Sequence, residues 1–543
     1  MGEVCSAPED TGGKRPHEQL HRESPTAKES PSPGSWARLQ AGLFHPLALL
    51  TLLILATLVA RARVLSTPIA GVRQTQTAMI SDNLGRDLDE LGPPALFYPR
   101  IDYAGDQPGY LLLEFPVVNL AGVFLARAFG LSREIAYRLP SLLLFAAMLP
   151  FFFAFVRARF GTMEAIVSTL LVAYFPVVVD QSMEPMPEQG AATAFVAGLY
   201  FSARHVEAGR SRHLVAAAVC FALMLLIKST FVLLLLAPAG LLWGRGGKRG
   251  IRLAHAVAGV SCFVPLSLWL AHASAVNRAS VLDDGTVVSE LVGNFLAQHG
   301  RWALLGTPGT YAKFWEMLSR AYGSWPLLLL AAGSVYGLIR CRGNRVLLAA
   351  WLAAFLLFFV AVPFNASNHS YYTHGYATLI AIAGAVLLCA VVRSGAALVP
   401  RWARPSTFAA LAALALAFVV QARWETTPLV HQRVYEFGQA LQRIASPRAL
   451  GIISTPDRGV WDGELLYASN TRGWRSILRK GPSRRELSLE FIEEKRLRGA
   501  EFLAHYGRPA ELAASKPELF RLLTEKNTVL AKSPEWIVFS LVE

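Results

Sequence analysis

Long apolar runs alternate with shorter polar connections over most of the chain. Eleven such runs follow one another, at residues 44–60, 134–156, 164–180, 189–204, 213–228, 230–244, 253–272, 323–340, 345–363, 375–393 and 405–421. At about 1.5 Å of rise per residue, runs of this length approach the roughly 30 Å of a bilayer's hydrocarbon core. The pattern therefore predicts a mainly α-helical, polytopic membrane protein with about eleven transmembrane helices.

The composition agrees with a membrane protein. Of the 543 residues, 53% are hydrophobic and 17% are charged, and the mean hydropathy is +0.37, which is too apolar for a soluble chain of this length. The net charge of +14 could indicate a nucleic-acid partner. The basic residues lie between the apolar runs, however, as they do in the cytoplasmic loops of membrane proteins, so we expect no nucleic-acid binding.

The basic connections predict how the helices are oriented. With a cytoplasmic N-terminus, the inner connections are 157–159, 204–212, 245–252, 340–345 and 393–404, and all five are basic. This agrees with the positive-inside rule. The segments 64–132, 180–188, 273–322 and 364–374 and the C-terminal tail then lie outside. Arg61 and Arg63 are the exceptions, because they fall on the outer side.

Changes in composition divide the chain into three parts. Residues 1–40 have few large apolar side chains and predict a disordered cytoplasmic tail. Residues 41–422 form the transmembrane domain, beginning with an anchor helix rather than a cleaved signal peptide. Residues 423–543 predict a small extracytoplasmic α/β domain, with helices at 431–445, 461–469 and 484–498 and strands at 449–454, 474–478, 501–505 and 536–542. This domain has no phosphate-binding loop, metal-spaced cluster or nucleophile elbow, which favours a supporting or acceptor-recognition role.

The first outer segment, 64–132, is dense in Arg, Asp, Glu and aromatic residues. Its spacing predicts helices at 71–91 and 115–129 that lie in the membrane interface, since neither is suited to span it. Between them, the glycines and prolines at 92–94 and 105–109 predict irregular backbone. Such irregularity suits a binding loop.

Acidic and aromatic residues gather at the outer ends of several predicted spans. Ionisable groups at membrane level are costly and commonly line a polar cavity or a substrate path. The residues are Asp82, Asp102, Glu114, Asp180, Glu184, Glu188, His369, Tyr371 and Tyr372. Two simpler interpretations stay open: the acids could be solvated loop residues, and the aromatic residues could belong to an interfacial belt.

Four basic residues near the same ends are candidates for holding a phosphate. They are Arg73, Arg100, Arg138 and Lys228. Arg138 begins the second span, where its guanidinium could bind a phosphate through two hydrogen bonds or act as an interfacial anchor. Lys228 interrupts two apolar runs and could pair with a lipid phosphate or extend to the interface.

The order of short motifs along the chain resembles that of a known family. The motifs are Arg73-Gln74-x-x-Thr77-Ala78, Tyr98-Pro99-Arg100-Ile101-Asp102, Glu114-Phe115-Pro116, Arg138-Leu139-Pro140-Ser141, Met186-Pro187-Glu188 and His369-x-Tyr371-Tyr372. Together they resemble the membrane-embedded C-type (GT-C) glycosyltransferases of family 39, in the branch of bacterial protein O-mannosyltransferase and lipid A aminoarabinose transferase relatives. The resemblance implies that a sugar moves from a polyprenyl-phosphate donor to a lipid, glycan or protein acceptor. The transfer would take place on the outer face of the bacterial plasma membrane, with inversion.

One departure from the family pattern concerns the catalytic base. Relatives commonly carry Trp-Arg-Gln-x-Asp-Thr-Ala, whereas Val72 and Gln76 occupy the Trp and Asp positions here. Since an amide cannot act as a general base, Asp102, Glu188 or Asp82 would take this part. Asp102 is the first choice, because it ends an ordered-looking motif.

The remaining candidates are assigned to substrate binding. They are Arg73, Gln76, Arg100, Glu114, Arg138, Lys228, His369, Tyr371 and Tyr372. A lipid-phosphate sugar already carries its leaving group, so a carboxylate and cations suffice and no nucleotide is needed. The sequence predicts no certain cofactor and no metal ligands, and it leaves the use of a divalent metal open.

Two other classes of function compete with this hypothesis. Many spans with charged residues at membrane level also describe transporters and lipid flippases, although the chain shows no inverted repeat. A non-catalytic protein of the same fold that binds lipid-linked sugar is the other alternative, because Gln76 replaces the expected acid.

Overall fold

The computed structural model describes residues 46–69, 71–102, 104–107, 109–244, 249–281, 287–290, 302–398, 432–456, 462–478 and 485–542. The chain divides into two compact units, Met1–Leu49 and Leu50–Glu543, and every contact discussed below lies within the second. The predicted tail 1–40 and the predicted span 405–421 lie outside the described residues.

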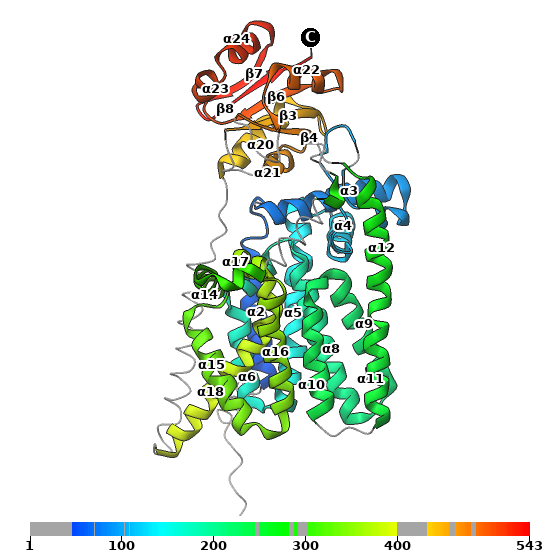
Figure 1. Ribbon diagram of the computed structural model, residues 1–543, viewed down its shortest axis with the longest axis vertical. Helices are drawn as coiled ribbons and strands as arrows, with labels where there is room; N and C mark the ends of the chain where they lie inside the picture. Colours follow the sequence, from blue (N-terminus) through cyan, green and yellow to red (C-terminus); the bar gives the residue numbers. More distant parts are fainter. Residues whose placement is uncertain are drawn as a thin grey trace, which may run out of the picture. The chain divides into compact units, whose positions relative to one another are not determined.

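Helices dominate the part of the chain that precedes residue 399 (Figure 1). The α-helices are α2 (Pro46–Ala62), α3 (Val72–Leu91), α4 (Val117–Phe129), α5 (Arg133–Arg159), α6 (Thr162–Tyr174), α7 (Pro176–Met183), α8 (Pro187–Ala208), α9 (Ser211–Ile227), α10 (Leu236–Gly244), α11 (Arg249–Ser261), α12 (Phe263–Ala279), α14 (Pro308–Tyr322), α15 (Ser324–Arg340), α16 (Arg345–Ala361), α17 (Pro363–Asn368) and α18 (Ala377–Leu398). The 3-10 helices are η1 (Pro93–Phe97), η2 (Ser229–Leu235), η3 (Trp302–Gly306), η4 (Arg342–Asn344) and η5 (Ser370–Tyr376).

Several of these helices are long and apolar enough to cross a membrane. In the described residues they are four stretches, Arg133–Arg159, Gly250–Ala279, Arg342–Ala361 and Ser370–Ser394. Two bent pairs, α6 with α7 and α14 with Leu327–Arg340, raise the number to six if each pair is one span. The prediction of a mainly helical, multi-pass membrane protein is confirmed, whereas the count of eleven spans stays a prediction.

Breaks in the helices explain why the apolar runs and the detected spans differ in number. The run 164–180 folds as two helices bent by 62°, because Pro176 begins a new helix. The run 213–228 becomes the 17-residue α9, which ends before Lys228, and the next run begins as a 3-10 helix. Apolar composition therefore located these segments but did not show where their backbone breaks.

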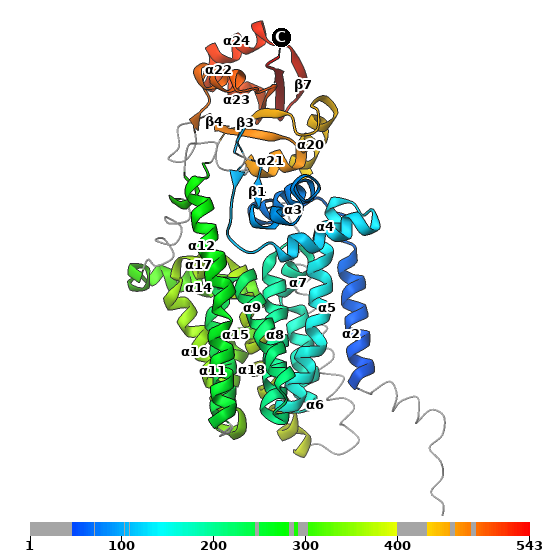
Figure 2. The ribbon, with the colours of Figure 1, turned by 90° about the vertical axis from the view of Figure 1, so that its right-hand side faces the viewer.

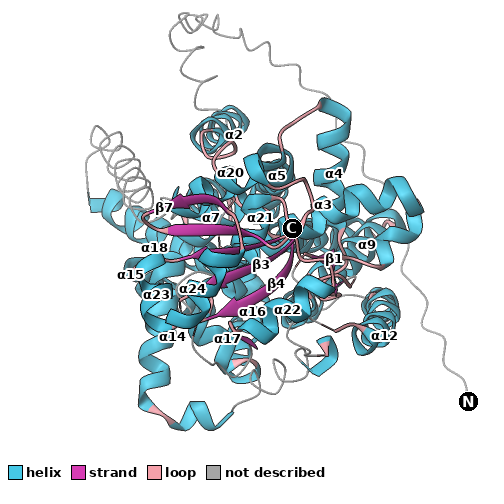
Figure 3. Cartoon of the chain, turned by 90° about the horizontal axis from the view of Figure 1, so that it is seen from above, coloured by secondary structure: helices cyan, strands magenta, loops and turns pink. Residues whose placement is uncertain are grey.

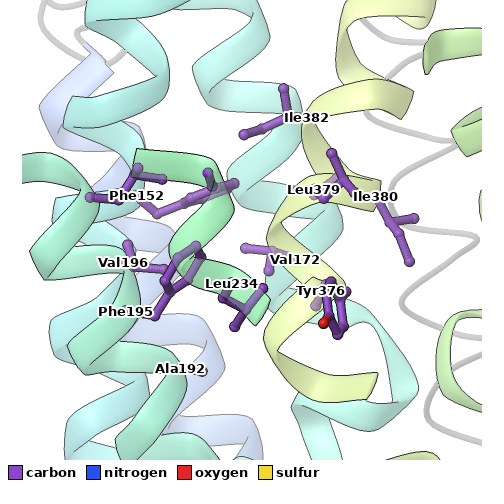
Figure 4. Packing of buried hydrophobic residues seen from close by; sticks show 14 of the residues in the cluster. Phe152, Val172, Ala192, Phe195, Val196, Leu234, Tyr376, Leu379, Ile380 and Ile382 are labelled. Carbon is purple, nitrogen blue, oxygen red and sulfur yellow. The ribbon is translucent and has the colours of Figure 1, made fainter. Parts of the chain in front are cut away.

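The buried core of the helical region is built from large apolar side chains of α5, α6, α8, η2 and α18. Figure 4 shows Phe152, Val172, Phe195, Leu234 and Ile380 packed together, and all belong to one buried cluster. Packing of this kind stabilises helices in a bilayer through close van der Waals contact.

Arg61, which broke the positive-inside rule, is a buried residue rather than a loop charge. Its guanidinium carbon lies 3.9 Å from the centre of the Phe145 ring, and the group donates a hydrogen bond to the Ala173 carbonyl. Its side chain therefore fastens α2 to α5 and α6. A residue held inside the protein is not subject to a rule about loops.

The C-terminal part folds around a six-stranded sheet with the order β5-β4-β3-β6-β8-β7 (Figure 3). Its strands are β3 (Leu450–Thr455), β4 (Arg472–Ile477), β5 (Arg485–Glu486), β6 (Phe502–Tyr506), β7 (Val529–Ser533) and β8 (Trp536–Ser540), and its helices are α20 (Gln432–Ile444), α21 (Asp462–Ser469), α22 (Leu489–Leu497), α23 (Pro509–Ser515) and α24 (Pro517–Lys526). β3 pairs in parallel with β4 and β6, whereas β8 runs antiparallel to β6 and β7. The predicted α/β character is observed.

The predicted helix at 484–498 begins later than expected. Residues 485–486 form β5, and α22 begins after Ser488, whose side chain accepts a hydrogen bond from the Phe491 backbone at 3.1 Å. This side-chain cap satisfies a backbone N–H that the first turn leaves unpaired. The helix therefore starts at its cap rather than at the first charged residue of the run.

The sheet contacts the first outer segment through backbone hydrogen bonds. A short hairpin of β1 (Arg100–Ile101) and β2 (Gly109–Tyr110) lies in this segment, and Figure 2 shows it near β4 and α21. Gly105 donates to the Gly473 carbonyl at 3.0 Å, and Gly473 donates to the Asp102 carbonyl at 3.1 Å. Gly473 has φ +149°, and a Cβ there would lie 1.9 Å from the Gly451 oxygen, so only glycine fits.

Candidate functional site

Four charged side chains from distant parts of the chain meet in one buried cluster. Arg73 and Lys228 both pair with Glu114, and the Lys228 Nζ lies 2.9 Å from the Glu114 Oε1. The same Nζ lies 2.6 Å from the Glu188 Oε1. We call Arg73, Glu114, Glu188 and Lys228 the Lys228 cluster. Two cations and two acids in contact, away from water, make a strongly polar site within an otherwise apolar region.

Local breaks in the helices place these side chains. Lys228 occupies the junction between α9 and η2, and Glu188 follows Pro187 in the first turn of α8. Proline is favoured at that first helical position, and the positive end of the helix dipole stabilises an acid there. Phe115 donates a backbone hydrogen bond to the Leu226 carbonyl at 3.0 Å, which holds the neighbouring Glu114 against the end of α9.

An aromatic wall borders the Lys228 cluster. The Lys228 Nζ lies 4.9 Å from the centre of the Tyr372 ring and 5.7 Å from that of Tyr371. His369 stacks on Tyr371 with ring centres 5.2 Å apart. The structure thus brings the predicted His369, Tyr371 and Tyr372 together with the predicted Lys228, and the rings can stabilise the ammonium through cation–π contact.

Glu188 is the most enclosed member of the cluster. Its side chain has no exposed surface, and in the described part of the chain neither carboxylate oxygen accepts a hydrogen bond. Lys228 pairs with the Glu188 Oε1, and Arg73 adds a second positive charge nearby. A buried carboxylate without hydrogen-bond donors retains free lone pairs, so it can accept a proton from a substrate group that reaches it.

Glu114 is in the opposite situation, because two cations hold it. Burial alone would raise its pKa, but the charges and hydrogen bonds of Arg73 and Lys228 outweigh this effect and lower the pKa from 4.5 to about 2. Glu114 therefore stays ionised at any physiological pH. It orients the two cations rather than exchanging protons.

This pKa shift predicts a pH dependence of stability. The carboxylate is depressed below its ordinary value of 4.5, so its stabilising effect is complete above about pH 4.5 and is lost as the pH falls toward 2. We expect wild type to have a higher Tm than Glu114→Gln at neutral pH, and this gap to close between pH 4.5 and pH 2. Thermal unfolding in detergent across this range measures the gap, and a gap that stays constant would contradict the assignment.

Gln76 lies beside the cluster. The Arg73 guanidinium donates to the Gln76 Oε1 at 3.5 Å, one turn along α3. The residue at the family's acidic position thus contacts an arginine of the site. A cavity of about 20 Å³, lined by Arg73, Glu114, Asn119 and Pro187, adjoins the same groups.

Asp102, the first choice for the base, lies outside the Lys228 cluster. Its carboxylate accepts hydrogen bonds from Asn83 at 3.0 Å and from Arg448 of the C-terminal part. Arg100 pairs with Asp87 instead of a cluster member. Together with the backbone hydrogen bonds of Gly473, the pair of Asp102 with Arg448 connects the first outer segment to the C-terminal part.

Asp82 and Arg138 are also engaged elsewhere. Asp82 accepts hydrogen bonds from Tyr137 at 2.5 Å and Arg133 at 2.9 Å, and burial raises its pKa above the ordinary value although both donors oppose this. The Arg138 guanidinium is completely buried and donates to the carbonyls of Leu65, Thr67 and Pro68 and to Glu184. Arg138 therefore fixes the backbone that leads into α3.

A second, polar pocket of about 120 Å³ lies between the start of α5 and the helices α20 and α21. Arg133, Glu134, Gln439, Gln442 and Tyr467 contribute to its lining. Tyr467 is 4% exposed, and its hydroxyl has no hydrogen-bond partner in the described residues. Sequence reasoning missed this pocket and Arg448, because their partners are remote in sequence.

No group of three or more His, Cys, Asp and Glu side chains in the described residues could hold a metal ion. The Lys228 cluster contributes two acids, and each already pairs with Lys228.

The chain thus combines a helical bundle, a cluster of paired acids and cations within it, and a C-terminal sheet. Residues 113–271 match the family described as dolichyl-phosphate-mannose-protein mannosyltransferase. This stretch contains Glu114, Glu188 and Lys228. Comparison with curated protein sequences gives no significant match.

Three solved structures show the particular likeness. The chain superposes on ArnT from Cupriavidus metallidurans, bound to undecaprenyl phosphate, with TM-score 0.60 and 14% identity over 91% of this chain and 98% of ArnT. The oligosaccharyltransferase AglB from Archaeoglobus fulgidus, in complex with an inhibitory peptide and a dolichol-phosphate, superposes with TM-score 0.56 and 10% identity. The match covers 91% of this chain and 74% of AglB. The arabinofuranosyltransferase AftD from Mycobacteria superposes with TM-score 0.54 and 14% identity, and the match covers 92% of this chain and 41% of AftD.

These similarities confirm the resemblance predicted from the motifs. The chain shares the C-type fold of ArnT, AglB and AftD, and its residues 113–271 are similar in sequence to the protein mannosyltransferase family.

Proposed function

We propose that the protein is an integral-membrane glycosyltransferase that moves a sugar from a polyprenyl-phosphate donor to an acceptor hydroxyl, with inversion at the anomeric carbon. The observation that carries the proposal is the Lys228 cluster, in which a fully buried carboxylate lies beside two cations in this fold. The lipid phosphates bound to ArnT and AglB support the class of donor.

Glu188 is the catalytic base in this proposal. The acceptor oxygen attacks the anomeric carbon while its proton passes to a carboxylate oxygen of Glu188. The bond between that carbon and the phosphate oxygen breaks, and polyprenyl phosphate leaves with the bonding electrons. No nucleotide, oxidant or reductant takes part, because the donor carries its own leaving group.

Charge balance in the cluster supports this assignment. Arg73 and Lys228 together match Glu114 and Glu188, so the resting site is neutral. When Glu188 accepts the proton, the site gains one positive charge as the donor's phosphodiester becomes a phosphomonoester with one more negative charge. Lys228, released from Glu188, can then stabilise the departing phosphate within an environment of low dielectric.

The rings of His369, Tyr371 and Tyr372 would line the sugar pocket beside the phosphate. Gln76 would bind the donor or acceptor through its amide, because it contacts Arg73 but cannot take up a proton. Arg100, Arg138, Asp82 and Asp102 would support the site from outside, through the pairs that hold the first outer segment and the sheet.

The C-terminal part would contribute to acceptor recognition. The pocket that it shares with α5 contains amides, an acid and the Tyr467 hydroxyl, which has no hydrogen-bond partner among the described residues, and such groups suit the hydroxyls of a glycan. The domain boundaries 41–422 and 423–543, a cytoplasmic N-terminus, an outer-face site and a bacterial plasma-membrane location all belong to this proposal.

The test is transfer by purified protein in lipid, supplied with radiolabelled polyprenyl-phosphate sugars and a membrane extract as acceptor. Label that leaves the donor in the presence of extract supports an enzyme. Donor binding without transfer would instead favour a non-catalytic protein that binds lipid-linked sugar, the alternative that Gln76 in the acidic position suggests.

Asp102→Asn separates the two leading candidates for the base. We expect less than a tenfold loss of transfer, because the hydrogen bonds of Asp102 are to Asn83 and Arg448 and not to the cluster. Its removal should show instead in stability, at a cost of about 1–3 kcal/mol for the weakened pair. Transfer rate and Tm, measured on the same preparation, check both parts. A loss of transfer of 10²-fold or more with unchanged Tm would instead identify Asp102 as the catalytic base.

A further inference from the structure

An apolar cavity of about 600 Å³ is lined by residues of α8, α9, η2, α10 and α11. Phe221, Val232, Leu236, Trp243 and Val260 are typical of its lining. This volume is in the ordinary range for ligand cavities in proteins. Figure 1 shows these helices side by side, and α9 contacts both α8 and α11.

The cavity extends from Val232 and Leu233, four and five residues after Lys228, to Ser202 and His255 near the far end of α8. Glu188 is in the first turn of α8 and His205 is in its last, about 17 residues or roughly 25 Å along the helix axis. His205 packs against His255, which lines the cavity, with ring centres 4.8 Å apart. A headgroup bound beside these two histidines is therefore separate from a donor phosphate held at Lys228.

Three buried polar atoms at this end lack partners in the part of the chain that the structure describes. They are the Ser202 Oγ, the His205 Nε2 and the His255 Nε2, and the three side chains are 0%, 5% and 8% exposed. Ser202 and His255 belong to the cavity lining. Since a buried polar atom without a hydrogen-bond partner destabilises the fold, these atoms point to a ligand that satisfies them.

The histidine tautomers define what that ligand must offer. The His255 Nδ1 lies 3.0 Å from the Ile251 carbonyl oxygen, and the His205 Nδ1 lies 2.9 Å from the Arg210 carbonyl oxygen. A carbonyl oxygen only accepts, so Nδ1 carries the proton and the Nε2 of each neutral ring has a free lone pair. The lone pairs require a hydrogen-bond donor. Arg252 also lines the cavity and is exposed, so its guanidinium is available to an anion.

We propose that this cavity binds a phospholipid with an ethanolamine headgroup, in the leaflet opposite to the Lys228 cluster. Its acyl chain lies along the apolar lining, its phosphate pairs with Arg252, and its ammonium donates to the His255 Nε2. The combination of hydrocarbon, anion and amine donor fits this lipid. Phosphatidylcholine offers the same phosphate and chains, but its trimethylated nitrogen cannot donate, and free phosphate would leave the apolar lining unused.

Gly259 allows the cavity to be closed without a clash. A Cβ at this position meets no atom within 4 Å, and the residue lines the cavity on α11. A leucine side chain at this position would project into the space that the acyl chain would occupy. Leucine also has a higher helix propensity than glycine. Gly259→Leu should therefore exclude the lipid while preserving the fold.

The experiment is native mass spectrometry of the full-length protein, titrated with phosphatidylethanolamine or phosphatidylcholine in detergent. We expect wild type to retain phosphatidylethanolamine about tenfold more strongly. The preference should be lost in His255→Phe and Arg252→Gln, and retention of either lipid should fall in Gly259→Leu. Arg157→Gln, an exposed arginine at the end of α5, is the matched control and should behave as wild type.

Two results would overturn the proposal. One is equal retention of the two lipids by wild type, and the other is undiminished retention by Gly259→Leu with a Tm at or above that of wild type. Tm identifies any variant that fails to fold. Sugar transfer should stay within twofold of wild type in all of these variants, because none touches the Lys228 cluster.

Discussion

Replacement of Glu188 by glutamine is expected to lower the turnover number for sugar transfer by about 10²–10⁴-fold, the range that general base catalysis supplies. Glutamine has nearly the same shape, but its amide cannot accept the proton of the acceptor hydroxyl. Lys228 keeps its pair with Glu114 in this variant, so the cations that hold the donor phosphate remain in place. Donor binding should therefore stay close to that of wild type.

The measurement is single-turnover transfer from a radiolabelled donor, with donor binding measured separately. Glu207→Gln is a matched control, since Glu207 lies on the same helix but at its other end. Its rate should equal that of wild type. If Glu188→Gln transferred sugar at the rate of the control, another group would have to accept the proton, and the proposed role of Glu188 would be wrong.

Much of the C-terminal fold could be predicted from local sequence. β3 and β4 are buried at five of their six positions, and the β-branched and aromatic residues Ile452, Ile453, Trp474 and Ile477 within them indicated strands. β7 escaped prediction because it is a half-exposed edge strand whose pattern does not alternate. α23 and α24 also escaped, since each is a short helix that follows proline and carries much polar surface. The hydrophobic pattern of a segment indicates which of its residues are buried, and these three elements have few buried residues.

The site was predictable as a set of residues but not as an arrangement. Glu114, Lys228 and Glu188 were each chosen because charge at membrane level is costly. Their pairing depends on contacts such as that between Lys228 and Glu114, 114 positions apart, which no local pattern contains. Asp102 shows the opposite problem. Its motif drew attention, whereas its partner Arg448 lies 346 positions away in the C-terminal part.

Lys228→Met is expected to give the largest loss of stability, because Lys228 is the one residue that pairs with both acids of the cluster. Methionine has a similar length but no charge. In this variant Glu114 keeps its ion pair with Arg73, whereas Glu188 stays fully buried and loses its ion pair with Lys228. Breaking a buried pair in this way costs about 3–5 kcal/mol, and transfer should fall as well, since the departing phosphate loses a cation.

A double variant separates these two effects. Lys228→Met with Glu188→Gln removes the uncompensated charge, so we expect a higher Tm than that of Lys228→Met alone, although a second residue has been changed. Transfer should stay as low as in either single variant, because base and cation are both absent. Lys313→Met, on the exposed surface of α14, controls for the loss of a lysine. A double variant less stable than Lys228→Met would mean that Glu188 is held by something other than Lys228.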